Sequence, residues 1–520
     1  MDTLLTKLGE KIKGQLLGFD RIVFKGHLRP LCCAAGMQTL LIRNKVFIKD
    51  YRDWLRAKSV IICEDALQYT QEQCQTPVQY LSSNNIRKEA MAREHQQKAG
   101  ITSGLIGTWS SVEACTTYKS VYEQKSGWLE IKREFSKCKH LYFYYDHEDY
   151  GFMSIRLQTW APYEIQIALN GRSWLKRLLE KAGCGFIAEG NKFFDIDDYD
   201  LAQKLLDSQL DTHWIELLEG FLPDVFPSMR DVIGDHLNYH WSLWQSEWAK
   251  DYIFADPEVL NTHMQPLLRH AFITGTSDRV IRYFGHPIRP DGQPFPTAKP
   301  EVRTRLKKWC DGARIKHWSD NNSLKVYNEH CVLRFEFTMN NPERFRIYRT
   351  AEGDSDGIKK LRPMRKGVAD IVPRTQICTA GINNFTEHMA TLEEDCTVAE
   401  VLAKVSKRVK FKGKSVRALD VTGKDLALLQ AVADPKYFVG AITNKQLQVA
   451  LASSPWANGL TEKKLSARIS RHLRMLRAHG IIKKLPNQHK YMLTAKGRLL
   501  TSAINQFLGA KLSDLATFVA

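Results

Sequence analysis

The sequence lacks any apolar run as long as the roughly 18 to 20 residues that a membrane-spanning helix needs. Its N-terminal stretch, MDTLLTKLGEKIKGQLLGFDR, alternates charged with apolar residues, unlike the continuous apolar core of a secretory signal peptide. We therefore expect no membrane partner, and a cytoplasmic location that is nucleoid-associated if the protein is bacterial.

Sequence motifs of several enzyme classes are also missing. The chain has no G-x-x-x-x-G-K-[ST] phosphate loop, no G-x-S-x-G nucleophile elbow and no H-E-x-x-H zinc motif. It has 11 cysteines but no C-x-x-C pair. This usage disfavours a zinc knuckle and predicts reduced, intracellular thiols in place of a disulfide frame.

Acidic residues are scarce in the last quarter of the chain. Residues 401–520 hold 22 Lys and Arg against 5 Asp and Glu, whereas the first 400 residues hold 53 against 52. Nearly all of the formal net charge of +18 therefore belongs to one segment. A localised basic segment predicts a polyanion partner, because each phosphate that it neutralises releases condensed counterions. The expected partner is DNA, with RNA as the alternative.

The composition, 43% hydrophobic and 25% charged, is ordinary for folded domains, and 520 residues are enough for several of them. We expect an α+β multidomain protein built from antiparallel, β-rich α+β units with a helical middle segment. The expected parts are a mixed α/β N-terminal region at 1–100, a β-rich α+β domain at 101–205, a helical segment with a Pro-rich linker at 206–300, an antiparallel β domain with a basic polar face at 301–400 and a nucleic-acid-binding domain at 401–520.

The predicted helical middle contains two groups of aromatic and imidazole side chains. Trp241, Trp244 and Trp248 fall on one face of a predicted helix, and we interpret them as core residues in preference to a stacking platform for bases. His236 and His240 have the i, i+4 spacing of a metal-binding pair. Without a clear third ligand, a structural role is the simpler interpretation.

The clearest local pattern lies near the C-terminus. Helices are predicted from about Thr422, across TNKQLQVALASS, and over 461–479. Gly480 is the expected left-handed stop of the third helix. The short strands IIKKL and KYMLT flank PNQH, and Thr494 is expected to cap a final helix. The third helix should pack its apolar residues against a core: Leu465, Ile469, Leu473 and Leu476.

The stretch LRMLRAHGIIKKLPNQHKYMLTAKGR resembles the third helix and wing of MarR-like bacterial winged-helix proteins, in which GLI or GII opens the wing and Y-x-L-T-x-x-G closes it. The resemblance covers about 100 residues from Thr422 onward. It implies a C-terminal winged helix-turn-helix, with the third helix in a major groove and the wing along the backbone. The nucleic-acid-binding residues that it implies are Lys464, Arg468, Arg471, Arg474, Lys483, Lys484, Gln488, His489 and Lys490.

Alternating apolar and polar residues predict strands in ARIKHW, SLKVYN, VLRFEFTM and RFRIYR. One face of these strands would be apolar and the other rich in cations. We expect the cationic face to cradle a sugar-phosphate backbone. Its proposed contacts are Arg314, Lys316, Arg334, Arg344 and Arg346.

Within these strands, SLKVYNEHCVLRFEF resembles a strand pair of some rolling-circle replication initiators, where a Lys/Tyr strand precedes an Arg-x-Glu strand. The resemblance spans about 15 residues, and the chain lacks the H-x-H metal-binding pair that those enzymes often carry. It implies that Tyr327 attacks a phosphate, that Glu336 holds Mg²⁺ and that Lys325 stabilises the developing charge. Mg²⁺ is the cofactor expected if the sheet is catalytic; the sequence itself assigns no metal site.

Three further carboxylates stay open as candidates. Asp20 lies in a predicted strand, while Asp146 and Glu148 lie near the end of another. They could contribute to a two-metal nuclease site or occupy turns and surface positions.

Three functions fit these observations. The first is a DNA-binding protein whose upstream domains act on or assemble around nucleic acid, as in a mobile genetic element, a replication system, or a metal-dependent nuclease or strand-transfer enzyme. The second is a non-catalytic transcription regulator with a large effector or oligomerisation region. The third is an RNA-binding component of a ribonucleoprotein.

Overall fold

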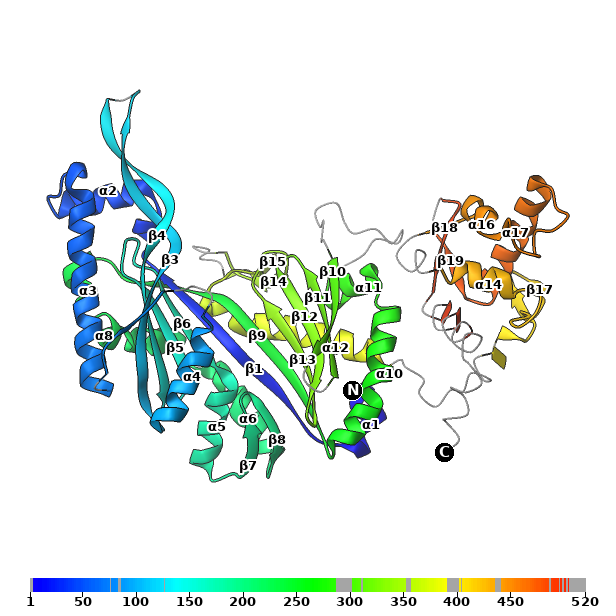
Figure 1. The fold of residues 1–520 in the computed structure, drawn as a ribbon, viewed down its shortest axis with the longest axis horizontal. Coiled ribbons are helices and arrows are strands. Elements are labelled where there is room, and N and C mark those ends of the chain that lie inside the picture. The colour runs from blue at the N-terminus through cyan, green and yellow to red at the C-terminus, as the bar shows by residue number, and fades with distance from the viewer. Residues whose placement is uncertain are drawn as a thin grey trace.

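The computed structural model describes residues 3–286, 302–390 and 402–501, with short gaps at 75, 83–85, 126, 310–311, 352–356, 404, 435–440, 486–487, 495 and 498–499, together with residue 504. The protein is mixed α/β, with a large mixed sheet and a smaller C-terminal unit (Figure 1). The predicted Pro-rich linker, 286–300, lies almost wholly outside the described residues. No described helix is long and apolar enough to cross a membrane.

A single eleven-stranded sheet dominates the described structure, in the order β10-β11-β12-β13-β9-β1-β6-β5-β4-β3-β2. Neighbouring strands are antiparallel except for β2 and β3. The strands come from all four segments predicted upstream of residue 401, and they join into one sheet. Their bounds are β1 (Ile12–His27), β2 (Gln79–Leu81), β3 (Gly104–Glu123), β4 (Trp128–His147), β5 (Gly151–Gln158), β6 (Ile165–Asn170), β9 (His240–Phe254), β10 (Val302–Trp309), β11 (Gly312–Ser319), β12 (Asn322–Glu329) and β13 (Val332–Met339).

Helices pack on both faces of this sheet. One face, the core face, carries the main hydrophobic core beneath α3 (Tyr51–Cys74), α10 (Pro257–Thr274), α11 (Ser277–Tyr283) and α12 (Ile371–Ala390). The other, the polar face, is covered at one end by α5 (Gly171–Ala182), α6 (Tyr199–Ser208) and the hairpin of β7 (Phe186–Glu189) and β8 (Lys192–Ile196), which share a second apolar cluster. The remaining elements are α1 (Thr3–Leu8), α2 (Ala34–Arg43), α4 (Lys88–Ala99), α7 (Trp214–Gly220), α8 (Leu222–Val225), α9 (Met229–Ile233), β14 (Arg346–Arg349) and β15 (Lys360–Pro363).

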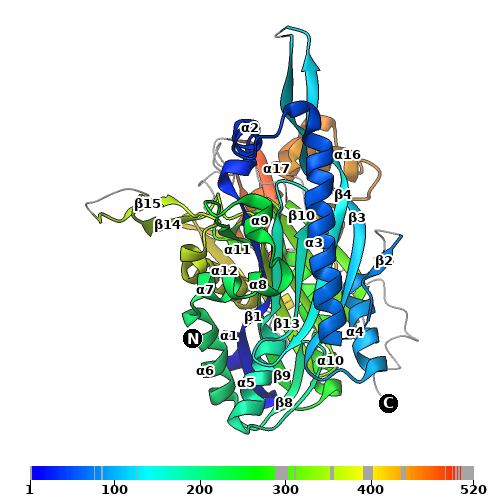
Figure 2. The ribbon, with the colours of Figure 1, turned by 90° about the vertical axis from the view of Figure 1, so that its left-hand side faces the viewer.

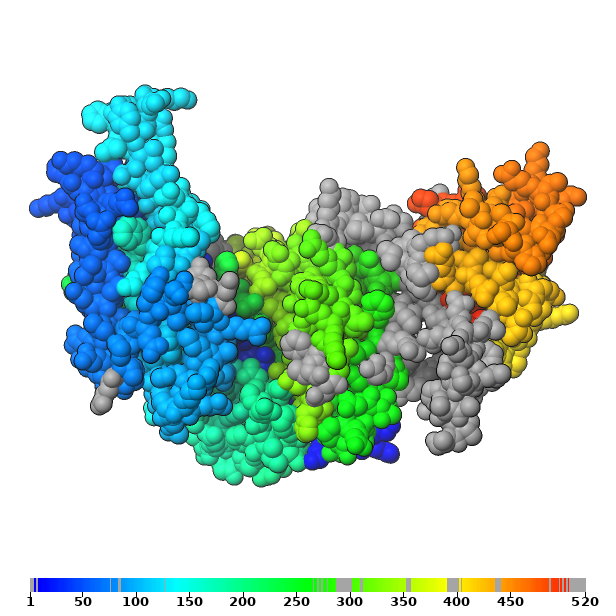
Figure 3. Space-filling model, viewed as in Figure 1, coloured from blue at the N-terminus to red at the C-terminus, as the bar shows by residue number. Residues whose placement is uncertain are grey.

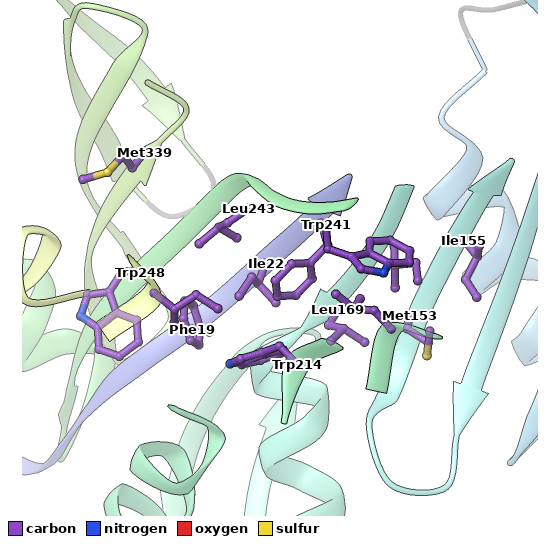
Figure 4. Close-up of a cluster of buried hydrophobic side chains, with 14 of the residues drawn as sticks. Phe19, Ile22, Met153, Ile155, Leu169, Trp214, Trp241, Leu243, Trp248 and Met339 are labelled. Atoms are coloured by element: carbon purple, nitrogen blue, oxygen red, sulfur yellow. The ribbon is translucent and has the colours of Figure 1, made fainter. Parts of the chain in front are cut away.

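The expectation of a helical segment at 206–300 is wrong for His240–Phe254, which form strand β9 beside β1. Trp241 and Trp248 are buried in the core, as interpreted, but from a strand and not from a helix face. Phe19 of β1 meets Trp248 edge-on, with ring centroids 4.8 Å apart (Figure 4). His236 lies in a turn before β9 and His240 begins the strand, so the two do not share a helix face.

Strands β3 and β4 continue past the body of the sheet as a twisted two-stranded ribbon, which projects at the top of Figure 2. A disulfide joins Cys115 to Cys138 across it, with Cα atoms 6.8 Å apart. The expectation of wholly reduced thiols is therefore wrong for this pair. The reason is the strand register, which pairs Cys115 with Ser136 and Cys138 with Glu113 and so sets the two cysteines diagonally opposite.

The C-terminal residues build their own hydrophobic core, separate from that of the sheet. The predicted stop of the long helix is present, because Gly480 has a φ of 71°. The helix expected from Thr422 begins at Leu426, and Gly497 N donates to Thr494 Oγ1 over 2.9 Å at the position where the sequence predicts the cap of the final helix. The described elements are β16 (Val409–Phe411), β17 (Lys414–Val416), α14 (Leu426–Val432), β18 (Ile442–Thr443), α16 (Asn444–Leu451), α17 (Glu462–Ala478), β19 (Ile482–Lys484) and β20 (Lys490–Leu493).

Candidate carboxylate metal centre

A β-bulge at Asp20 interrupts the central strand pair. Phe19 pairs with Trp248 and Arg21 pairs with Glu247, so Asp20 is an extra residue in β1. A bulge breaks the regular alternation of side chains and re-aims the residue that it contains. The Asp20 side chain is buried, at 7% exposure, and its carboxylate joins a cluster that crosses three neighbouring strands.

That cluster consists of Asp20 on β1, Glu247 on β9 and Glu336 on β13. One carboxylate oxygen from each residue lies within 4.8 Å of the other two. The residue opposite Glu336 in β9 is Ala249, whose small side chain leaves room beside the glutamate. Three carboxylates that converge from separate strands form the kind of oxygen-only ligand set that Mg²⁺ and Mn²⁺ prefer.

Two buried arginines fix the acidic groups around the centre. Arg334 donates to both oxygens of Asp251, from Nε over 2.6 Å and from Nη2 over 2.9 Å, and its Nη1 donates to Asp20 over 3.0 Å. Arg172, which lies in the first turn of α5, is 3.0 Å from the same Asp251 carboxylate. The prediction that Arg334 contacts a phosphate backbone is wrong, because its side chain is enclosed by these partners.

Lys325 and Glu336 form an ion pair between neighbouring strands, as their facing positions in β12 and β13 require. Thr338 also donates to Glu336, over 3.0 Å. Burial alone would raise the pKa of Glu336, but the charge and hydrogen bond of Lys325 outweigh it and lower the pKa. Glu336 is therefore held as a carboxylate.

Glu247 differs from the other acids of the cluster, since no ion pair reaches it within the described part of the chain. Burial and then the charge of Glu336 raise its pKa to about 7. The four acids Asp20, Glu247, Asp251 and Glu336 thus face three paired cations. A pKa of about 7 leaves Glu247 only partly ionised at neutral pH, and a divalent cation bound beside it would favour its charged form.

A cavity of about 210 Å³ opens onto this centre. Its polar lining comes from Asp20, Arg21, Glu89, Ser154, Asn170, Asn191 and Glu247. Asn191 donates to Asp20 over 3.1 Å and accepts from Asn170 over 2.7 Å. Figure 3 shows a hollow between the side of the molecule that carries α4 and the side that carries β12, with the blue N-terminal segment at its bottom.

Tyr327, the predicted nucleophile, lies on the same polar face, directly opposite Arg334 in β13 and Arg314 in β11. Its side chain is buried, at 8% exposure, and burial raises its pKa well above the usual value. A phenol in this state is a weak nucleophile. Arg314 and Lys316 lie at the same end of the sheet and are partly exposed.

Arg344 and Arg346 do not extend this face. Arg344 pairs with Asp320, with Nε and Oδ2 2.5 Å apart. Arg346 is exposed on β14, which pairs with β15 in a separate two-stranded sheet. The predicted basic face of the 301–400 segment is therefore divided between two sheets.

Asp146 and Glu148 also lie apart from the carboxylate centre. Asp146 accepts hydrogen bonds from Arg177 over 2.8 Å and from Gln96 over 2.6 Å. Glu148 lines a different cavity, of about 700 Å³, beside Tyr150 and other aromatic residues. Neither carboxylate contributes to a metal-like cluster among the described residues.

Most of the C-terminal residues implied by the MarR-like resemblance are exposed. Arg468 is the exception, because its guanidinium lies 4.2 Å from the ring centroid of Trp456 and donates to that residue's carbonyl over 2.7 Å. Its role in this structure is to pack helix α17 onto its own domain. The exposed side chains are Lys464, Arg471, Arg474, Lys483, Lys484, Gln488, His489 and Lys490.

No protein-family model, curated protein or solved structure matches the chain.

Sequence reasoning missed Glu247, Asp251, Arg172 and Asn191. The first two lie in SEWAKDYIF, within the segment where the tryptophan spacing predicts a helix. Its period of two, with Glu247, Ala249 and Asp251 on one side, was the available signal for a strand with an acidic face. Arg172 and Asn191 carry no such signal, since only the packing of α5 and the β7–β8 turn brings them to the sheet.

Proposed function

We propose that this protein is a metal-dependent phosphoryl-transfer enzyme acting on nucleic acid, either a nuclease or a strand-transfer enzyme. The observation that carries the proposal is the convergence of Asp20, Glu247 and Glu336, one oxygen from each within 4.8 Å of the others, beside a cavity. Two buried carboxylates and one half-buried carboxylate, placed by strands, a bulge and paired arginines, are costly unless a cation or a reaction uses them.

The residues fit Mg²⁺ or Mn²⁺, because every donor is a carboxylate oxygen. Such an ion would be held by Asp20, Glu247 and Glu336, and it would supply Lewis-acid polarisation of a phosphoryl oxygen and a more acidic bound water. The protein's own side chains hold the ligand carboxylates in place. Arg334 fixes Asp20, and Lys325 keeps Glu336 ionised and adds a positive charge near the phosphate, where charge develops during transfer.

DNA is the substrate that we favour, and the C-terminal unit supports this choice. Its described order of elements, α14, β18, α16, α17, β19 and β20, agrees with that of a winged helix-turn-helix. The exposed faces of α17 and of the β19–β20 hairpin carry several lysines and arginines. In the proposed arrangement this unit binds duplex DNA, and the central sheet acts on a neighbouring part of the same molecule.

The test is a cleavage assay with the full-length protein on end-labelled single-stranded and duplex DNA and on RNA, with Mg²⁺ or Mn²⁺ and with EDTA. We expect metal-dependent products that Glu247→Gln reduces at least about 100-fold, a typical loss for a catalytic electrostatic group. Glu148→Gln, an exposed acid outside the site, is the matched control. Equal activity of Glu247→Gln and wild type, or no product with any substrate, would contradict the proposal.

A further inference from the structure

A second bulge in the central strand pair lies at Trp244 of β9. Val23 pairs with Gln245 and Phe24 pairs with Leu243, so Trp244 is an extra residue in its strand. Its side chain is 43% exposed, while the two other tryptophans of β9 discussed above are buried. The bulge thus presents one indole to solvent and removes it from the core.

Two lysines lie over this indole. The Nζ atoms of Lys25 and Lys366 are 4.4 Å and 4.6 Å from the ring centroid. Backbone contacts hold Lys366 in place, because Leu243 N donates to its carbonyl over 2.6 Å and Gly367 forms a β-bridge with Ser242. Lys25 is therefore positioned by β1 and Lys366 by its backbone contacts with β9, and both of these strands carry residues of the carboxylate centre.

The indole lines a cavity of about 470 Å³, which we call the basic cavity. Four Lys and Arg side chains line it against one glutamate, Glu164, which pairs with Lys25 at 2.5 Å. The lining thus combines a net positive charge with one exposed aromatic ring. Its charged and aromatic members are Lys25, His27, Arg29, Glu164, His240, Trp244, Arg365 and Lys366.

The basic cavity and the carboxylate cavity share a face of the sheet. Arg21, which lines the carboxylate cavity, and Lys25, which lines the basic one, face Asn170 and Gln166 of β6 in one unbroken register, so they point the same way. Along β9, Trp244 precedes Glu247 by three residues, roughly 10 Å at the rise of a strand.

We propose that an unpaired base displaces the two ammonium groups from the indole of Trp244 and stacks on it, while Lys25 and Lys366 turn to the flanking phosphates, so that the substrate of the carboxylate centre is single-stranded nucleic acid or a single-stranded part of a duplex. This inference rests on the proposed function and names its substrate class. In an intact duplex both faces of a base are already stacked, whereas an unpaired base offers a free π-face to an aromatic side chain.

The first experiment measures affinity for a fluorescein-labelled single strand and for the duplex of the same sequence, with the full-length protein in EDTA. Trp244→Ala should weaken single-strand binding about 5- to 150-fold, since a stacked base contributes about 1–3 kcal/mol. Trp244→Phe should restore most of the affinity. Trp128→Ala, which alters an indole that is 75% exposed on the ribbon, should leave the affinity unchanged.

A second experiment reports the contact directly, and so is not masked by binding to the C-terminal unit. A single strand with one 5-iodouracil is irradiated with the wild-type protein, and the crosslinked peptide is identified by mass spectrometry. An adduct at Trp244 supports the proposal. Adducts confined to the C-terminal unit, together with unchanged single-strand affinity in Trp244→Ala, would overturn it.

The two proposals fail separately. If Trp244→Ala loses single-strand binding but wild type cleaves no substrate with any metal, the stacking site stands and the proposed chemistry is wrong. If cleavage depends on Glu247 while Trp244→Ala binds and cleaves the single strand like wild type, the chemistry stands and the stacking site is wrong.

Discussion

Arg334 donates two hydrogen bonds, of 2.6 Å and 2.9 Å, to the carboxylate of Asp251 on the neighbouring strand of the eleven-stranded sheet. Both side chains are almost completely buried, at 3% and 1% exposure. Arg334 is the bridge between this acid and Asp20. The pair therefore fixes the position of the Asp20 carboxylate in the centre.

Breaking this pair should destabilise the sheet. Asp251→Asn removes a charge from between Arg334 and Arg172, and loss of one partner of a buried ion pair costs about 3–5 kcal/mol. Urea unfolding followed by tryptophan fluorescence measures the change. As a control, Asp53→Asn disrupts an exposed pair with Arg56 and should change the free energy of unfolding by under about 1 kcal/mol. Similar losses in both variants would show that the buried pair has no special role.

Glu247→Gln should weaken metal binding without loss of fold. Glu247 forms no ion pair among the described residues, so its amide analogue leaves the partners of Asp20 and Glu336 intact. Titration of wild type with Mn²⁺, followed by electron paramagnetic resonance, should give one saturable site or a close pair of sites. Glu247→Gln should weaken that binding at least about 10-fold, as ligand loss does in metal sites. Retained Mn²⁺ affinity would remove Glu247 from the ligand set.

Tyr327→Phe should retain cleavage and should not change the product ends. Burial raises the pKa of this phenol well above the usual value, so we expect water and not the tyrosyl oxygen to attack the phosphate. Denaturing electrophoresis after incubation with labelled DNA and Mg²⁺ should show no protein–DNA adduct in wild type or variant. An adduct that disappears in Tyr327→Phe would instead establish the mechanism implied by the resemblance to rolling-circle initiators.

Acidification should destabilise the sheet through His317, which is fully buried beside Phe385 and hydrogen-bonded through Nδ1 to Thr304. Burial lowers its pKa to about 4 from an ordinary 6.5. As the pH falls, the imidazole is protonated at a higher pH in the unfolded chain than in the folded one. Its contribution to the free energy of unfolding is therefore complete above pH 6.5 and is lost as the pH falls toward 4. Between pH 7 and pH 5 the loss is about 2 kcal/mol.

The measurement for His317 is the free energy of unfolding at both pH values. His317→Gln should show a smaller difference between them than wild type, by about that amount. His489→Gln, at an exposed position of the C-terminal hairpin, should keep the wild-type difference. An unchanged pH dependence in His317→Gln would assign the acid sensitivity to other groups.

Arg471→Ala with Arg474→Ala should weaken DNA binding and flatten its salt dependence, because both side chains are exposed on α17. For each phosphate that the variant no longer neutralises, the slope of log K against log salt should become shallower by about 0.9 for duplex DNA. Arg468→Ala should instead lower thermal stability, because Arg468 packs on Trp456. Unchanged affinity and slope in the double variant would remove this helix from the proposed binding surface.

Local patterns in the sequence predicted much of the secondary structure. The stop of α17 at Gly480 follows from a left-handed glycine, with a φ of 71°. The strict alternation of SLKVYN and VLRFEFTM predicted which side of these strands carries Lys325, Tyr327, Arg334 and Glu336, and the register confirms it. These features depend on neighbours within a few residues, so they can be read along the chain.

The carboxylate centre could be predicted only in part. Asp20 and Glu336 are separate candidates in the sequence, with no reason to pair residues 316 positions apart. Glu247 could not be predicted, because the tryptophans of β9 are spaced by three and four residues, as on one face of a helix. The bulge at Trp244 also interrupts the period of two that is typical of a strand. Bulges depend on how two strands fit together, and a single segment does not reveal them.

The sequence by itself determined the segregation of positive charge in the last 120 residues and the amphipathic faces of individual helices and strands, because composition and periodicity are properties of the chain. Tertiary structure alone decided that four successive segments share one sheet, that Asp20, Glu247 and Glu336 meet, and that Arg334 is an internal ion-pair partner and no phosphate ligand. The physical reason is that strand order, register and bulges arise from contacts between distant residues, and these contacts set both the burial and the electrostatics of each charged group.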